Sequence, residues 1–243
     1  MSDKEVLLKV TSDHLNTGLR GIPVGTCRTS FVTPTEGVHY CGYPITELAS
    51  FAPEDIIYLL FNKELPNAEQ SEEIRAELSA RATIPGGIET VLKTLPKDGH
   101  PMDWLSVGIH TLGMLETTND WRADAMNLIA RMPRLMGLIF RIRDGRDQNI
   151  PADDPSATLV DRFVNALDLK DVDKAKMTRV ISTYLVLHMD HGGGNLSTFT
   201  GKAIASGQAT VYSAMAGAMN ALSGPLHGRA NQSCLEFVLR VGT

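Results

Sequence analysis

The most informative part of the sequence is residues 188–232, which read HMDHGGGNLSTFTGKAIASGQATVYSAMAGAMNALSGPLHGRANQ. Between its two histidine-bearing ends lie segments 197–205 and 210–222, which consist largely of Ala, Gly, Ser, Thr and Met. Ala and Met favour helices, and small side chains allow helix axes to approach closely. We therefore expect two helices buried against their neighbours, with glycine-rich corners at their ends where chemistry can take place.

The first corner, residues 188–197, has the pattern of a helix C-terminus, a glycine-rich turn and a new helix capped by Asn195 or Ser197. Glycines let a ligand approach the backbone, and the free N–H groups of a helix N-terminus attract anions. The imidazole of His191 beside such a turn can hydrogen-bond a carboxylate or a carbonyl. A dicarboxylate or keto acid therefore fits this corner.

Other interpretations of the first corner stay open on the residues alone. His188, Asp190 and His191 have metal-ligating side chains, although no further ligand follows nearby. A purely structural turn with capping histidines is also consistent with the pattern. A dinucleotide site is disfavoured, because the G-x-G-x-x-G spacing is absent.

The second corner is residues 223–231, in which Gly224 and Pro225 end one helix and a new helix begins near Ala230. His227 lies in the tight turn between them. The positive end of a helix dipole favours a neutral imidazole, and a neutral imidazole can donate a hydrogen bond to a developing enolate oxygen. Taken alone, this corner is as consistent with a structural role as with a catalytic one.

The rest of the chain predicts a mostly helical protein with one β-hairpin. Residues 24–32 and 38–43 flank the turn Thr33-Pro34-Thr35-Glu36-Gly37, a pattern typical of a hairpin. Beyond Pro44, apolar residues recur at helical spacing. We expect helices at residues 45–51, 85–95, 125–143, 155–167 and 171–188, and further helices that begin near Pro53, Asn67 and Pro101.

The net charge of the chain bears on whether nucleic acid is a partner. The net charge is −5, which argues against nucleic acid because no basic face is present overall. One local exception is a set of five arginines, Arg131, Arg134, Arg141, Arg143 and Arg146. We interpret them chiefly as the solvated face and last turn of a helix, with phosphate binding as the alternative.

The cysteines and the first residues indicate a compartment. Cys27, Cys41 and Cys234 show no metal-type spacing and are typical of reduced thiols. The start, MSDKEVLLKV, is too charged for a secretory signal. Apolar runs do not reach the roughly 18 residues that a membrane span needs. We expect a soluble cytoplasmic protein without membrane or nucleic-acid partners.

Together, the two corners closely resemble the signature region of the citrate synthases. The resemblance rests on HMDHGGGNLSTFT at 188–200, the small-residue helices, and GPLHGRANQ at 224–232. Upstream, GLRGIPVGTCRTSF at 18–31 and GVHYCGYPITELA at 37–49 resemble the amino-terminal hairpin of the family, and ELP at 64–66 and HPM at 100–102 also match. The resemblance extends over nearly the whole chain, in the right order.

This resemblance implies an all-α fold: a large helical domain with a small amino-terminal β-hairpin, assembled as a homodimer. It implies that oxaloacetate and acetyl-CoA are condensed to citrate and CoA, the entry step of the tricarboxylic acid cycle. His227 would be the catalytic histidine that stabilises the enol of acetyl-CoA. His191 would bind oxaloacetate, with Asn195 lining the same pocket. No metal and no cofactor beyond the substrate acetyl-CoA are implied.

The chain also departs from the family pattern. Cys41 stands where the family usually has Arg, Gly192 stands where an acid is common, and Arg229 replaces a smaller residue. The second catalytic histidine, the catalytic aspartate and the substrate-binding arginines are expected beyond Thr243. The resemblance therefore implies a large helical domain at 1–226 and the start of a smaller, truncated domain at 227–243, inactive alone. Alternatives are a 2-methylcitrate synthase and a non-catalytic helical dimerisation fragment.

Overall fold

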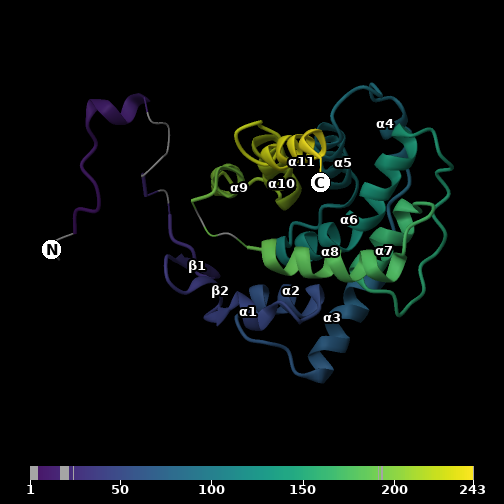
Figure 1. Cartoon of the computed structure of the whole chain (residues 1–243), viewed down its shortest axis with the longest axis horizontal. Helices are drawn as coiled ribbons and strands as arrows, with labels where there is room; N and C mark the ends of the chain where they lie inside the picture. The colour runs from purple at the N-terminus through teal and green to yellow at the C-terminus, as the bar shows by residue number, and fades with distance from the viewer. Residues whose placement is uncertain (1–4, 17–21, 24, 191, 193, 243) are drawn as a thin grey trace.

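The computed structural model describes residues 5–16, 22–23, 25–190, 192 and 194–242. Helices dominate it, and a small sheet lies at one side of the helical body (Figure 1). The α-helices are α1 Ile45–Leu48, α2 Pro53–Asn62, α3 Ala68–Arg81, α4 Ile88–Lys93, α5 Pro101–Glu116, α6 Trp121–Arg143, α7 Leu159–Leu167, α8 Lys174–His188, α9 Leu196–Ser206, α10 Val211–Leu222 and α11 Ala230–Val241. The strands are β1 Ser30–Thr33, β2 Gly37–Tyr40 and β3 Tyr43–Pro44, and a 3₁₀-helix covers Ser12–Asn16. The predicted all-α architecture with a small amino-terminal hairpin is confirmed.

The sheet has three antiparallel strands in the order β1-β2-β3. The hairpin turn between β1 and β2 lies where the sequence predicts it. The second strand, predicted over 38–43, instead ends at Tyr40, because Cys41 and Gly42 have positive φ angles of 49° and 93° and reverse the chain. Such two-residue turns match the twist of paired strands. The first strand is shortened to β1, and Val24, its predicted start, lies outside the described residues.

Several helices begin where the capping signals predict. The Asn67 side chain accepts the Gln70 N–H and the Gln70 side chain accepts the Asn67 N–H, both at 2.9 Å, so a capping box starts α3. Pro53 and Pro101 occupy the first turns of α2 and α5. α6 begins earlier than predicted, because the Asp120 carboxylate accepts hydrogen bonds from the first free N–H groups of that helix.

The largest core lies between α5, α6 and α10. Trp104, Leu112, Leu135 and Tyr212 are almost completely buried there, and burying one such side chain stabilises a fold by roughly 1.5–3 kcal/mol. α10 lies close to α5 because residue 113 is glycine: a Cβ on Gly113 would lie 2.6 Å from the Cβ of Tyr212. α10 is therefore firmly held, and so is the start of the turn that follows it.

A second apolar cluster fastens the sheet to the helices. Tyr40 of β2, Leu48 of α1, Ile56 and Leu59 of α2, and Val186 of α8 are each fully buried in it. The sheet is thereby held beside the last turn of α8. The first histidine corner of the sequence begins directly after that turn.

α9 and α10 pack as a pair but differ in burial. α10 buries Tyr212, Ala214 and Ala216, whereas no residue of α9 is fully buried. The prediction that both helices are buried is wrong for α9, which packs on α10 and leaves its other side exposed. The close approach predicted from small residues does occur, since a Cβ on Gly217 would lie 2.1 Å from Cδ1 of Ile204.

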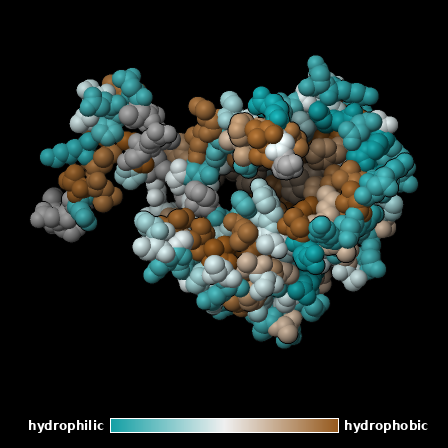
Figure 2. Space-filling model, viewed as in Figure 1, coloured by the Kyte–Doolittle hydropathy of each residue, from teal (hydrophilic) through white to brown (hydrophobic). Residues whose placement is uncertain are grey.

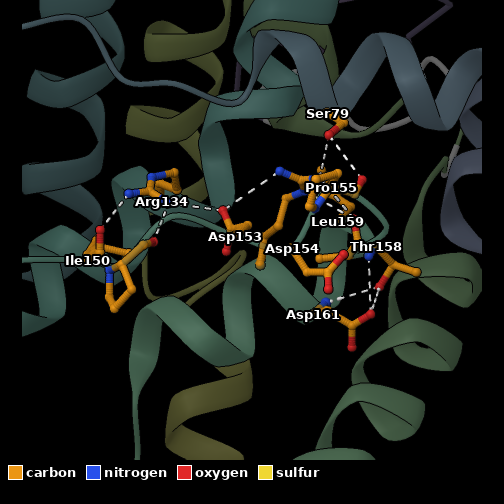
Figure 3. Close-up of polar contacts among 12 residues, drawn as sticks. Ser79, Arg134, Ile150, Asp153, Asp154, Pro155, Thr158, Leu159 and Asp161 are labelled. Atoms are coloured by element: carbon orange, nitrogen blue, oxygen red, sulfur yellow. Dashed lines mark hydrogen bonds and ion pairs between the residues drawn. The ribbon is translucent and has the colours of Figure 1, made fainter.

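The arginines of α6 are not a solvated face. The buried Arg141 donates from Nε to the Ala166 carbonyl at 2.6 Å. Arg134 donates to two backbone carbonyls and to Asp153 at 2.9 Å, and Arg162 of α7 also faces Asp153 at 3.7 Å (Figure 3). Arg141 also donates to the Asp147 and Asn149 carbonyls. Arg134, Arg141 and Arg162 therefore fasten the loop at residues 144–158, which we call the arginine-held loop. The remaining arginines of the predicted set bond backbone carbonyls elsewhere: Arg131 that of Thr83, Arg143 that of Gly99 and Arg146 that of Leu167. The solvated interpretation is wrong because the oxygens that these arginines bind come from loops and helices distant in the sequence.

Cys27, Cys41 and Cys234 are all free thiols, as the sequence predicts. In the described part of the chain, no helix is both long enough and apolar enough to cross a membrane.

Candidate active site

His227 lies in the tight turn between α10 and α11, which we call the His227 turn and define as residues 223–229. Its backbone N–H donates to the Gly224 carbonyl at 3.0 Å, and the Gly228 N–H donates to the Leu222 carbonyl at 3.0 Å. A Cβ on Gly228 would lie 2.6 Å from that same carbonyl oxygen. Glycine is therefore required at 228 for the turn to close, and the backbone under His227 is well fixed.

The imidazole of His227 has an unusual environment. Its Nε2 is shielded from solvent and has no hydrogen-bond partner among the described residues. Leaving a buried polar atom unbonded costs roughly 1–3 kcal/mol, and such atoms are rare in folded proteins. A bound molecule with an oxygen at this position would supply the missing partner.

Other unbonded buried atoms have more ordinary surroundings. The Oε2 atoms of Glu54 and Glu116 lack partners among the described residues, but the Oε1 atom of each carboxylate accepts a hydrogen bond. His39 lies in β2, and its ring stacks on Phe31 with centroids 4.5 Å apart. The Nδ1 of His39 is also unbonded in the described part of the chain, and His227 differs from His39 because it lies in a turn between two helices rather than in a strand.

Asn195 caps α9 and is one of the two capping residues, Asn195 or Ser197, that the sequence predicts. Its Oδ1 accepts hydrogen bonds from the Ser197 N–H at 3.1 Å and from the Ser197 hydroxyl at 2.8 Å. The capping role uses the carbonyl oxygen of the side chain. The Nδ2 amide group remains as the part of Asn195 that can donate to a ligand.

α9, which Asn195 caps, packs on α10, which leads into the His227 turn. Gly201 lies against Ala214 and Ala218, and Ile204 lies against Gly217. The two helices follow one another in the chain and are joined by a short connection (Figure 1). The packing of this helix pair therefore links the segment that begins at Asn195 to the segment that ends before His227.

His191, the predicted oxaloacetate ligand, lies outside the described residues, so its role stays a prediction. Its chain neighbours Asp190 and Gly192 are described. The Gly192 N–H donates to Oδ1 of Asp190 at 2.9 Å, which closes a short turn after α8. Gly192 is buried and has a φ angle of +84°, a conformation that glycine adopts without strain.

One connection was not found by sequence reasoning. His100, at the start of α5, accepts the Met102 N–H at Nδ1 over 3.2 Å, and its Nε2 lies 3.1 Å from Oε1 of Gln232 in α11. With Nδ1 accepting, Nε2 carries the proton and donates to Gln232. The contact joins the core helix α5 to the helix that follows His227. The HPM motif at 100–102 was the available signal.

The larger cavity found among the described residues lies away from His227. It has a volume of about 900 Å³ and is bounded by the end of α3, by α6 and by the arginine-held loop. Arg134, Arg162 and Asp153 line it, but they bond protein oxygens or one another (Figure 3). No metal-type cluster of His, Cys, Asp or Glu occurs among the described residues.

The sequence profile of the family described as citrate synthase, C-terminal domain, matches residues 18–243 of the chain. The chain belongs to the citrate synthase family. The two histidine corners, the small-residue helices and the hairpin all lie within the matched region.

Individual relatives agree with this family assignment. The chain is 30% identical to the peroxisomal citrate synthase of Saccharomyces cerevisiae, over 97% of this chain and 55% of the relative. It is 30% identical to the mitochondrial citrate synthase of Daucus carota, over 98% of this chain and 55% of that relative. The chain thus spans about half the length of the curated citrate synthases that it matches.

Solved structures support the fold. The structure resembles the citrate synthase of Thermotoga maritima MSB8 with a TM-score of 0.80 and that of Pyrobaculum aerophilum with a TM-score of 0.84. Each is 24% identical in sequence, and each match covers 93% of this chain and 60% of the other. The helical architecture is therefore that of the citrate synthases.

The expected cytoplasmic location is contradicted. The two curated relatives are named as the peroxisomal and the mitochondrial enzyme. Net charge and the composition of the first residues do not distinguish these compartments, which is why that prediction was wrong. The division of the chain at residues 226 and 227 stays a prediction.

Proposed function

We propose that this chain carries the enol-stabilising and oxaloacetate-binding part of a citrate-forming site. The observation that supports the proposal most directly is the buried, unbonded Nε2 of His227 in a turn that glycine closes tightly. The substrates are oxaloacetate and acetyl-CoA, and the products are citrate and CoA. Histidine side chains polarise the substrate carbonyl groups by hydrogen bonding, so the proposed reaction includes no metal and no cofactor.

In the proposed reaction, a carboxylate base removes one proton from the methyl group of acetyl-CoA. The enol oxygen that develops accepts a hydrogen bond from the Nε2–H of His227. The enol carbon then attacks the keto carbon of oxaloacetate and forms a carbon–carbon bond. Water cleaves the thioester of the resulting citryl-CoA, which releases citrate and CoA. We assign the base by chemical class only.

The oxaloacetate side of the proposed site belongs to the first corner. His191 would hydrogen-bond oxaloacetate and Asn195 would line the same pocket, using the amide donor that its capping role leaves free. The packing of α9, which Asn195 caps, on α10, which precedes the His227 turn, supports this arrangement.

Citrate formation by a protein that contains this chain together with the carboxylate base, measured with and without His227→Ala, tests the proposal. Loss of a preorganised donor to a developing oxyanion lowers turnover on the order of 10²–10³-fold. A variant that retains most of the turnover would contradict the role of His227. Clear citrate formation by the 243-residue chain alone would contradict the alternative of a non-catalytic helical module. Propionyl-CoA offered in parallel identifies the acyl preference, because it would give 2-methylcitrate.

The exposed apolar surface supports a homodimer as the assembled form. Val180 and Tyr184 of α8 are 58% and 51% exposed, and Phe237 and Leu239 of α11 are 59% and 72% exposed. Figure 2 shows hydrophobic surface over α11. Large exposed apolar patches are typical of interaction surfaces. Light scattering after size exclusion tests this: a mass of twice the 26.4 kDa chain is expected, and a monomer would contradict it.

A further inference from the structure

We propose that Asp190 is a positioning residue that fastens the proposed oxaloacetate-binding turn to the β-sheet through the hydroxyl of Thr29. This inference deepens the proposed function and rests on it. It concerns the two chain neighbours of His191, namely Asp190 and Gly192, and the start of β1. These segments are distant in the sequence, since Thr29 and Asp190 are 161 residues apart.

Asp190 forms hydrogen bonds with three residues: Thr29, Gly192 and Tyr40. Its Oδ2 accepts a hydrogen bond from the Thr29 hydroxyl, and its Oδ1 accepts the Gly192 N–H at 2.9 Å. Its own N–H donates to the phenol oxygen of Tyr40 at 3.3 Å. One residue therefore connects the end of α8, the lead-in to β1 and the core of the sheet.

Each partner of Asp190 is itself anchored. Tyr40 is fully buried in the apolar cluster that fastens the sheet to α2 and α8. Burial raises the pKa of Tyr40, so its hydroxyl stays protonated and uncharged beside the Asp190 carboxylate. The Thr29 carbonyl accepts the Cys41 N–H at 2.6 Å, which continues the β1–β2 ladder by one residue. The carboxylate thus bonds a fixed surface rather than a mobile loop.

Gly192 shows how closely the turn lies on the sheet. A Cβ on residue 192 would lie 3.4 Å from the Ser30 hydroxyl oxygen and 3.9 Å from the Cys27 sulfur. Both distances are ordinary van der Waals contacts, so the turn lies directly on the sheet. The φ angle of +84° is what favours glycine at this position.

The arrangement fixes both chain neighbours of the proposed ligand histidine. The Asp190 carboxylate accepts the Gly192 N–H through one oxygen and the Thr29 hydroxyl through the other, so Asp190 and Gly192 are held at one place on the sheet. Misplacement of a substrate-holding group by about 1 Å can cost about 10²-fold in rate. The Thr29–Asp190 hydrogen bond is therefore expected to control oxaloacetate affinity rather than global stability.

The matched pair Thr29→Val and Thr29→Ser tests the inference on the full 243-residue chain, because valine keeps the shape and serine keeps the hydroxyl. Oxaloacetate affinity is measured by calorimetry, together with the thermal midpoint of unfolding. Thr29→Val is expected to weaken oxaloacetate binding about tenfold, the effect of losing one hydrogen bond to a charged group. Thr29→Ser is expected to bind within about twofold of the unmodified chain.

A second pair, Asp190→Ala and Asp190→Asn, serves if valine at position 29 disturbs the sheet. Asparagine keeps an oxygen for the Gly192 N–H and alanine does not, so alanine is expected to weaken binding more. Thr111→Val is the control, because it removes a hydroxyl that bonds the Val107 carbonyl at 2.8 Å within α5. That control is expected to leave oxaloacetate affinity unchanged.

The outcomes separate this inference from the proposed function. If the unmodified chain does not bind oxaloacetate, both fail. If it binds oxaloacetate and Thr29→Val binds equally well, only the positioning role is overturned. In a turnover assay, the positioning role predicts a higher KM for oxaloacetate with an unchanged KM for acetyl-CoA. A parallel rise in both constants would overturn it in favour of a general structural defect.

Discussion

Two segments of this protein place polar side chains between helices, and they differ in how those side chains are bonded. Around the arginine-held loop, Arg134 and Arg141 of α6 and Arg162 of α7 donate to carbonyl and carboxylate oxygens. In the His227 turn, the backbone is equally well bonded, but Nε2 of His227 has no partner among the described residues. A buried donor that is bonded stabilises the fold, whereas an unbonded one is tolerated where a ligand can supply the partner.

The largest effect on stability is expected for Arg141, whose guanidinium group is hydrogen-bonded. Arg141→Met removes the donors to the Ala166 and Asp147 carbonyls while keeping an apolar stem of similar length. Because it leaves buried acceptors unbonded, we expect the free energy of unfolding to fall by roughly 2–4 kcal/mol. Urea denaturation measures this. Arg179→Met on the exposed side of α8 is the control and should change stability by less than about 0.5 kcal/mol.

A much smaller effect on stability is expected for His227, whose Nε2 is unbonded among the described residues. His227→Leu replaces an imidazole whose Nε2 lacks a partner, so stability should stay within about 1 kcal/mol and need not fall. His100→Leu is the matched comparison, because that imidazole bonds Met102 and Gln232 and its loss should be destabilising. Both are measured by urea denaturation. A His227 variant as destabilised as the His100 variant would contradict the distinction between the two segments.

The smallest effect concerns Cys27, which lies beside Gly192. Burial raises the pKa of this thiol, but hydrogen bonds at Thr29 and Ser30, among them those from both backbone N–H groups and from the Ser30 hydroxyl, outweigh burial and lower the pKa from 9.0 to about 7. Because the folded state favours the thiolate, this contribution to stability is full above pH 9 and is lost as pH falls through 7.

We therefore expect the unfolding free energy of the chain to rise relative to Cys27→Ser between pH 7 and pH 9. Solvent screening limits the gain to less than about 1 kcal/mol. Urea denaturation of both proteins at several pH values measures the difference. A difference that shrinks with increasing pH would have the wrong sign.

Local signals predicted much of the fold. Asn67 with Gln70 predicted the start of α3, and Pro53 and Pro101 predicted the starts of α2 and α5, because capping depends on adjacent residues. Local signals failed for the strand that Cys41 ends, since a positive φ angle at a non-glycine residue is set by its surroundings. They failed again for α9, because the composition of a helix does not say how many neighbours it has.

For the candidate site, the sequence by itself determined the two glycine-rich corners, a helix that begins at Asn195 or Ser197, and the turn that contains His227. It also determined membership of the citrate synthase family, since the matched motifs are continuous segments. The tertiary structure alone decided that Arg134 and Arg141 of α6 bond the 144–158 loop, that His100 bonds Gln232, and that Thr29 bonds Asp190. The physical reason is that these hydrogen bonds join groups far apart in the chain, and only packing determines which donor meets which acceptor.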